Sequence, residues 1–286
     1  MAEITAAVVM KLRKISGQGM MDCKKALGEA NGDLDEALTI LRKKGLATMA
    51  KRAGRDTTEG RVVCKKSDDG KTVAMAMLCC ETDFASKSDD FVEVADKLAD
   101  AGMICEADSG ESIADVEIDG KTMVTHVTEL ISKTGEKTEI GDFARYTISG
   151  SGVIGAYVHF NDKTGALVEI ETSSDEASAA VETIAAEAAM HVVAVNPAGV
   201  DRETLDPEVV AKEREAVAES VKNKPAEIID KIVDGKMNKF FGENCVVDQP
   251  FVKDDSVTVG QAVSEAAKKG GGEAKIKRFI RFEIGS

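Results

Sequence analysis

The sequence predicts an α+β fold, because a strand–turn–strand–helix order occurs twice along the chain. In each copy, two runs of strand-forming residues flank a polar turn, and an apolar repeat with helical spacing follows. We therefore expect a core of two similar halves, each an antiparallel sheet with a helix. The predicted elements are strands at 60–66 and 72–80 with a helix at 89–101, then strands at 153–160 and 165–172 with a helix at 175–193.

The first residues, 1–55, predict a separate domain of three helices. An apolar stripe through Leu12 and Ile15 ends at the polar run 16–19, and a second helix is expected over 22–30. A third helix begins at Leu34, and Gly45 after two lysines predicts its end. Residues 46–59 lose the periodicity and are expected to form a partly helical linker.

The connection after the second strand is the first functional candidate. Residues 72–80 are apolar at nearly every position, which is typical of a strand covered on both faces. The loop that follows, 81–88, is longer than the link Ser173-Ser174 in the second copy, and it contains Phe84. Extra loop length favours a functional role. The ring of Phe84 is expected either to fold back under the loop or to be held out as an anchor for a partner.

The remaining segments are predicted less sharply. Residues 124–131 suggest a helix and 143–148 a strand, while 259–267 suggest a helix and 276–284 a strand that returns to the sheet. Between them, Pro207 and Pro225 each begin a helix, with Val209 and Ile228 among the residues expected to face inward. This inserted helical hairpin is either a coiled-coil arm for a partner or a buttress. The expected domains are 1–55, 56–146, 147–202 with 246–286, and 203–245.

Composition excludes several classes of function. With 37 Lys and Arg against 51 Asp and Glu, the net charge of −14 argues against a phosphate-neutralising surface for nucleic acid. The uncharged apolar runs are too short to span a bilayer, and the N-terminus does not read as a signal peptide. The six cysteines lack the spacing of a zinc site or a disulfide framework, so reduced thiols in the cytoplasm are expected.

Motifs for chemistry are weak. The run 150–155 (GSGVIG) matches a dinucleotide pattern by letter but leads into a strand, so it lacks the helix N-terminus that holds a pyrophosphate. Two Gly-Lys-Thr triplets lack the first glycine of a P-loop. His191 is expected to be a structural histidine, whereas His159 ends a strand beside a turn and is free to face a partner. No nucleophile–base pair is evident, and no cofactor or metal site is predicted.

Three stretches carry a resemblance to a known family. Residues 12–27 (LRKISGQGMMDCKKAL) resemble the N-terminal signature of translation elongation factor Ts, and 80–84 (CETDF) resemble its second signature. Residues 235–240 (GKMNKF) with 249–251 (QPF) resemble a third region. The likeness covers essentially the whole chain in order; among the small departures, Phe160 follows His159 where glycine is frequent.

The resemblance implies a guanine-nucleotide exchange factor for elongation factor Tu, without covalent chemistry and without a cofactor of its own. It implies a ubiquitin-associated-like N-terminal domain that docks on the nucleotide domain of Tu, in a complex that is one-to-one or two-to-two. Phe84 would wedge between helices of that domain, and Asp83 would act near its Mg²⁺. By the motif match, the residues at contact positions are Thr82, Asp83, Phe84, Arg13, Met20, Met21, Gly135, His159 and Met237.

Two other functions stay open from the residues alone. A chaperone-like or scaffolding binder would hold a partner through Met20, Met21 and the helical hairpin without promoting release, since flexible Met side chains suit adaptable surfaces. The same two methionines are equally consistent with core packing. A thiol enzyme that uses Cys79 or Cys80 ranks third.

Overall fold

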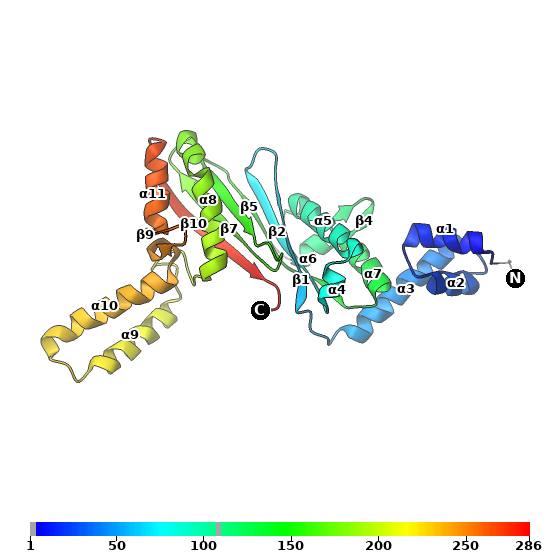
Figure 1. Ribbon diagram of the computed structural model, residues 1–286, viewed down its shortest axis with the longest axis horizontal. Coiled ribbons are helices and arrows are strands. Elements are labelled where there is room, and N and C mark those ends of the chain that lie inside the picture. The colour runs from blue at the N-terminus through cyan, green and yellow to red at the C-terminus, as the bar shows by residue number, and fades with distance from the viewer. Residues whose placement is uncertain (1–3, 107–109) are drawn as a thin grey trace.

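The computed structural model describes residues 4–106 and 110–286 as a mixture of helices and small antiparallel sheets. The molecule is elongated, with N-terminal helices at one end, a helical hairpin at the other and two sheets between them (Figure 1). The α+β class predicted from the sequence is therefore confirmed.

The N-terminal helices are α1 (Ala6–Ser16), α2 (Met20–Glu29) and α3 (Leu34–Arg52). Thr5 and Asp33 cap the starts of α1 and α3, and Gly17 ends α1 in the left-handed region at φ 66°. A small core of their own holds them together: Val9, Leu12, Cys23, Ala26, Leu27, Ala30, Ala37 and Leu41.

Two predictions for this end were wrong. The third helix does not end at Gly45 but continues to Arg52. It packs on α7 (Met123–Thr134) so closely that a Cβ on Gly45 would lie 2.6 Å from the carbonyl oxygen of Thr128. Glycine is thus required here for helix contact and not for a cap. Ile15, expected in the buried stripe of the first helix, is 56% exposed.

The first sheet has the order β1–β2–β5, from β1 (Glu59–Lys66), β2 (Thr72–Cys80) and β5 (Thr138–Thr147). One face packs on α5 (Asp89–Ile104) and α7. The connection between these helices contains α6 (Gly110–Ala114) and a two-stranded ribbon of β3 (Glu117–Ile118) and β4 (Lys121–Thr122). The helix and strand expected at 124–131 and 143–148 are therefore present but longer.

The second sheet has the order β10–β7–β6, from β6 (Gly152–Val158), β7 (Thr164–Thr172) and β10 (Ala274–Glu283). Its outer face is covered by α8 (Asp175–Val195) and α11 (Val259–Lys269). The helix α8 is long and apolar enough to cross a membrane by length and composition, but its Val181, Ala185 and Val192 are buried in this core. A short segment precedes α11: η1 (Val246–Asp248), β8 (Pro250–Phe251) and β9 (Asp254–Thr258).

The inner faces of the two sheets pack against each other. Val62, Met75 and Met77 from the first sheet meet Ile154, Leu167 and Phe282 from the second. The order of layers is helix, sheet, sheet, helix, as Figure 1 shows. Because β2 is central in its sheet and covered on both faces, it is buried along nearly its whole length, as its apolar sequence predicted.

The inserted hairpin consists of α9 (Pro207–Val221) and α10 (Ala226–Asn244), which lie side by side and project away from the sheets (Figure 1). Its buried residues are Val217, Val221, Val233 and Met237. Two residues expected to face inward, Val209 and Ile228, are instead exposed. The helical period therefore predicted the hairpin but misassigned part of its inner face.

Candidate functional site

The loop after β2 contains one helical turn, α4 (Asp83–Ser86). Thr82 begins this turn, since its Oγ1 accepts a hydrogen bond of 3.3 Å from the backbone N–H of Ala85. Ala85 and Ser86 are buried beneath the turn, whereas Phe84 is 85% exposed. Of the two positions considered for this ring, the structure shows the outward one.

Glu81 joins the loop to two other segments. Its carboxylate accepts hydrogen bonds from Arg52 Nη1 at 2.7 and 2.8 Å and from the backbone N–H of Lys137 at 2.6 Å. Arg55 is a more exposed partner, at 3.3 Å. Partial burial would raise the pKa of Glu81, but these donors outweigh it, so its pKa lies below the ordinary value. The end of α3, the loop and the start of β5 are thus connected through one ionised carboxylate.

The side chains of Thr82 and Asp83, the two residues before Phe84, also have polar partners. Thr82 Oγ1 donates to the carboxylate of Glu136, at 2.9 and 3.0 Å from its oxygens. Asp83 forms an ion pair of 2.7 Å with Lys87, and the hydrogen bond from Lys87 is the main reason why the pKa of Asp83 lies below its ordinary value. Asp83 is therefore ionised and half exposed beside the ring. Gly135, which ends α7 at φ 71°, lies next to Glu136.

A second turn lies at the same end of the sheets. Residues 159–163 connect β6 to β7, and Lys163 in this turn forms an ion pair of 2.7 Å with Glu59. Glu59 pairs in register with Cys80 at the end of β2, and the charge of Lys163 contributes to the lowered pKa of Asp83. We call the surface formed by residues 82–84, 135–136 and 159–163 the Phe84 face. His159 lies on this face, partly exposed, with a hydrogen bond of 3.1 Å between its Nδ1 and Tyr157 Oη.

Arg13, Met20 and Met21 lie apart from the Phe84 face, on α1 and α2. All three are exposed, Met21 by 75%, so neither methionine is core filler. Met10 and Ile15 are exposed in the same domain, at 53% and 56%, and the apolar stripe of the sequence did not mark them as surface residues.

The N-terminal domain is fixed to the core by polar contacts around Gln18, which is buried. Its Nε2 donates to the backbone oxygen of Glu129 at 3.4 Å, and Ser132 Oγ donates to its Oε1 at 3.4 Å. Ser132 Oγ is also 3.2 Å from the backbone oxygen of Leu41 on α3. These contacts join the domain that carries Met20 and Met21 to α7, the helix that ends beside Glu136 of the Phe84 face.

Met237 does not lie on an accessible surface. It is buried between the two helices of the hairpin, near Val217 and Val233, so its side chain has a packing role in this structure. The resemblance implies a contact position for Met237, and that implication stays a prediction.

The thiols are not placed for chemistry. Cys79 and Cys80 are buried, and burial is the main reason that their pKa values are raised to about 12. The thiol-enzyme alternative loses its support, because the reactive thiolate is strongly disfavoured. His191 is buried with a bond of 2.8 Å from its Nε2 to Gln249 Oε1, which confirms a structural histidine. Within 4–106 and 110–286, no group of three or more His, Cys, Asp or Glu residues is arranged to hold a metal.

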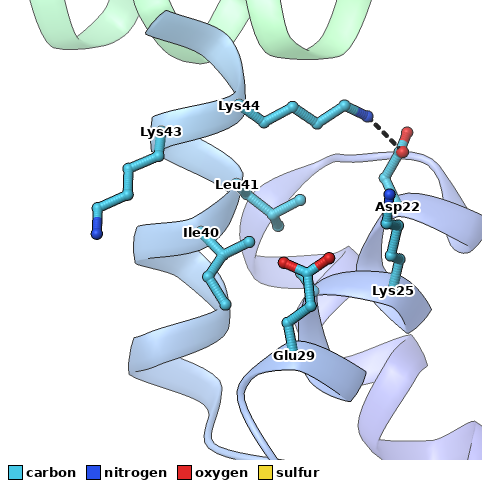
Figure 2. A pocket seen from close by; sticks show the side chains of 8 residues that line it. Asp22, Lys25, Glu29, Ile40, Leu41, Lys43 and Lys44 are labelled. Carbon is cyan, nitrogen blue, oxygen red and sulfur yellow. Dashed lines mark hydrogen bonds and ion pairs between the residues drawn. The ribbon is translucent and has the colours of Figure 1, made fainter. Parts of the chain in front are cut away.

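A cavity of about 450 Å³ lies between α2 and α3 in the N-terminal domain. Figure 2 shows charged side chains of both signs around Leu41 and Ile40, with an ion pair between Lys44 and Asp22. None of the predicted contact residues lines it.

Comparison with known proteins identifies a family for this chain. Residues 81–286 match the family model described as elongation factor TS. The chain is 40% identical over 286 residues to elongation factor Ts of Nitratidesulfovibrio vulgaris (strain DP4), covering 99% of this chain and 96% of the relative. It is 41% identical to that of Desulfovibrio desulfuricans, with 99% of each covered, and 39% identical to that of Nitratiruptor sp., with 99% and 93% covered. The chain belongs to the elongation factor Ts family.

Proposed function

We propose that this protein binds elongation factor Tu with GDP in the cytoplasm and promotes GDP release by disturbing the Mg²⁺ and phosphate site of that partner. Membership of the elongation factor Ts family supports the broader role, nucleotide exchange in translation elongation without covalent chemistry. The observation that carries the finer proposal is the 85% exposure of Phe84 on a loop in which hydrogen bonds hold Glu81 and Thr82.

The proposed mechanism uses the physics of the GDP site. A GTPase holds GDP largely through Mg²⁺-bridged phosphates and the backbone N–H groups of its P-loop. A phenyl ring inserted between the helices that support this loop shifts it and displaces the metal. Full burial of a Phe side chain contributes about 1.5–3 kcal/mol, which is available to stabilise the shifted state.

Linkage sets what this binding energy does. If the exchange factor favours the open state of the partner, its binding weakens the binding of GDP to that partner. GDP weakens the binding of the exchange factor by the same coupling free energy. The factor lowers the barrier to release and leaves the choice between GDP and GTP to their concentrations. The carboxylate of Asp83 acts beside the ring, near the Mg²⁺ of the partner. Mg²⁺ and GDP both belong to that partner.

The N-terminal domain supplies docking in this proposal. A ubiquitin-associated-like domain would place Arg13, Met20 and Met21 on the nucleotide domain of the partner, and adaptable Met side chains suit such a contact. The contacts of Gln18 with α7 support this assignment, because they keep the docking surface in fixed relation to Phe84. Gly135 and His159 would contact the partner on the Phe84 face.

A release assay tests the proposal. Fluorescent GDP bound to purified elongation factor Tu is mixed with unlabelled GDP and increasing amounts of this protein, and the dissociation rate is followed. An exchange factor raises the rate in a saturable manner. A scaffold that binds through Met20 and Met21 leaves the rate unchanged although a complex forms, and that outcome would reject the proposal. Light scattering of the same complex separates one-to-one from two-to-two assembly.

A further inference from the structure

A second aromatic ring is as exposed as Phe84 and has no part in the function proposed above. Phe160, in the turn between β6 and β7, is 87% exposed. Phe160 and Phe84 are the most exposed large apolar side chains in the part of the chain that the structure describes, and Met21 follows at 75%. Burial of a Phe ring stabilises a fold, so a ring left in water contributes little to this one.

The turn that carries Phe160 is fixed from within. The backbone N–H of His159 donates to Thr164 O, and that of Asp162 donates to His159 O, both at 2.8 Å. Asp162 adopts a left-handed conformation at φ 57°, which Asp tolerates better than most residues. The turn is therefore a defined structure and not a loose loop.

The turn is also fixed to the first sheet. Arg61 forms an ion pair of 2.5 Å with Asp162, and the backbone N–H of Val62 donates to Asp162 O at 2.6 Å. Lys163 adds its ion pair with Glu59. The ring of Phe160 lies against the ring of His159, with centroids 4.4 Å apart. An exposed ring on a braced turn loses little conformational entropy when a partner covers it.

The Phe160 turn is continuous with the surface that presents Phe84. Glu59, which binds Lys163, pairs with Cys80 just before the Phe84 loop, and α4 contacts β1. A protein surface that receives Phe84 must therefore approach the end of the sheets where Phe160 also projects.

We infer that Phe160, resting on His159, is a second apolar anchor for the GTPase that receives Phe84, and that it sets the affinity of the complex and not the rate of GDP release. This inference rests on the proposed function. The ring requires a shallow apolar patch on the partner, beside the site for Phe84. The ion pairs of this turn are made by Asp162 and Lys163, and Asp83 pairs with Lys87, so removal of the Phe160 ring changes the area of contact and takes no partner from these ion pairs.

The test compares Phe160→Ala, Phe160→Leu and the control Ile104→Ala. Ile104 is 59% exposed at the end of α5 that lies away from the Phe84 loop. The dissociation constant for nucleotide-free elongation factor Tu is measured by titration calorimetry, and the GDP-release rate is measured at saturation. We expect Phe160→Ala to weaken binding by about ten-fold, or about 1.4 kcal/mol. Phe160→Leu should recover part of the affinity, and Ile104→Ala should bind as the wild type.

For all three variants, the GDP-release rate at saturation should stay within about two-fold of the wild-type rate. Their melting temperatures should match the wild type because both side chains are exposed. Wild-type affinity for Phe160→Ala would overturn the inference and leave the proposed function standing. A ten-fold loss of the saturated rate at unchanged affinity would overturn it too, since Phe160 would then act in release. If the wild-type protein binds elongation factor Tu without accelerating GDP release, the exchange function alone is rejected. If it does not bind, both the exchange function and the inference about Phe160 are rejected.

Discussion

The carboxylate of Glu81 is predicted to determine how rigidly the Phe84 loop is held. The perturbation is Glu81→Gln, which preserves the size of the side chain and an oxygen that accepts the N–H of Lys137, but removes the charge. Charge-assisted hydrogen bonds such as those from Arg52 contribute about 1.5–3 kcal/mol. The pair with Arg55, which is 62% exposed, contributes about 0–1 kcal/mol. We expect the loop to lose about 2 kcal/mol of protection against local opening.

Hydrogen exchange at the amides of Ala85 and Ser86 measures this loss directly. Both amides are bonded to Thr82, so they exchange when the loop opens. A loss of about 2 kcal/mol corresponds to about 30-fold faster exchange. The matched control is Glu93→Gln, which removes an exposed i,i+4 pair with Lys97 on α5 and should change protection by less than about three-fold.

The effect has a defined pH dependence. The pKa of Glu81 is lowered on folding, so its stabilisation is present above its ordinary pKa of 4.5 and is lost as pH falls through the lowered value. The difference in protection between wild type and Glu81→Gln should therefore be full at neutral pH and shrink below 4.5. Equal protection of both proteins at neutral pH, or a difference that persists undiminished in acid, would refute the reasoning.

Two further predictions concern packing and thiol reactivity. Gly45→Ala should lower the free energy of unfolding by about 1–3 kcal/mol, measured by thermal unfolding, because its Cβ would lie 2.6 Å from Thr128 O. The control Gly235→Ala, with open space around it, should be neutral or slightly stabilising. Equal effects of the two substitutions would contradict the close contact of α3 with α7. In the folded protein at pH 8, Cys79 and Cys80 should resist alkylation by iodoacetamide, because a pKa of about 12 leaves about one thiol in ten thousand ionised. Mass spectrometry measures the extent of labelling, and rapid labelling would contradict the burial of these thiols.

The architecture was largely predictable because it depends on local signals. Polar turns between strand-forming runs predicted both hairpins, and the uniformly apolar residues of β2 predicted cover on both faces. The length of the loop after β2, compared with Ser173-Ser174, marked the Phe84 loop as a candidate site. Each of these signals lies within a few residues of the element it predicts.

The errors arose where a distant segment determines the structure. Gly45 follows two lysines and therefore resembles a helix end, but α7, far away in sequence, requires a residue without a side chain at that point. Ile15 follows the helical period, yet the period does not define which helix face is covered. The neighbouring positions of the Phe84 loop and the Phe160 turn depend on contacts between the two sheets, so no local pattern contained them.

The measurement that tests the account most directly is GDP release from elongation factor Tu stimulated by Phe84→Ala. Because the ring is 85% exposed, the variant should melt at the wild-type temperature. The account predicts that its stimulated release rate at saturation falls by at least about ten-fold, as expected when a contact made in the release step is lost. A folded Phe84→Ala variant that releases GDP at the wild-type rate would contradict the role assigned to this ring.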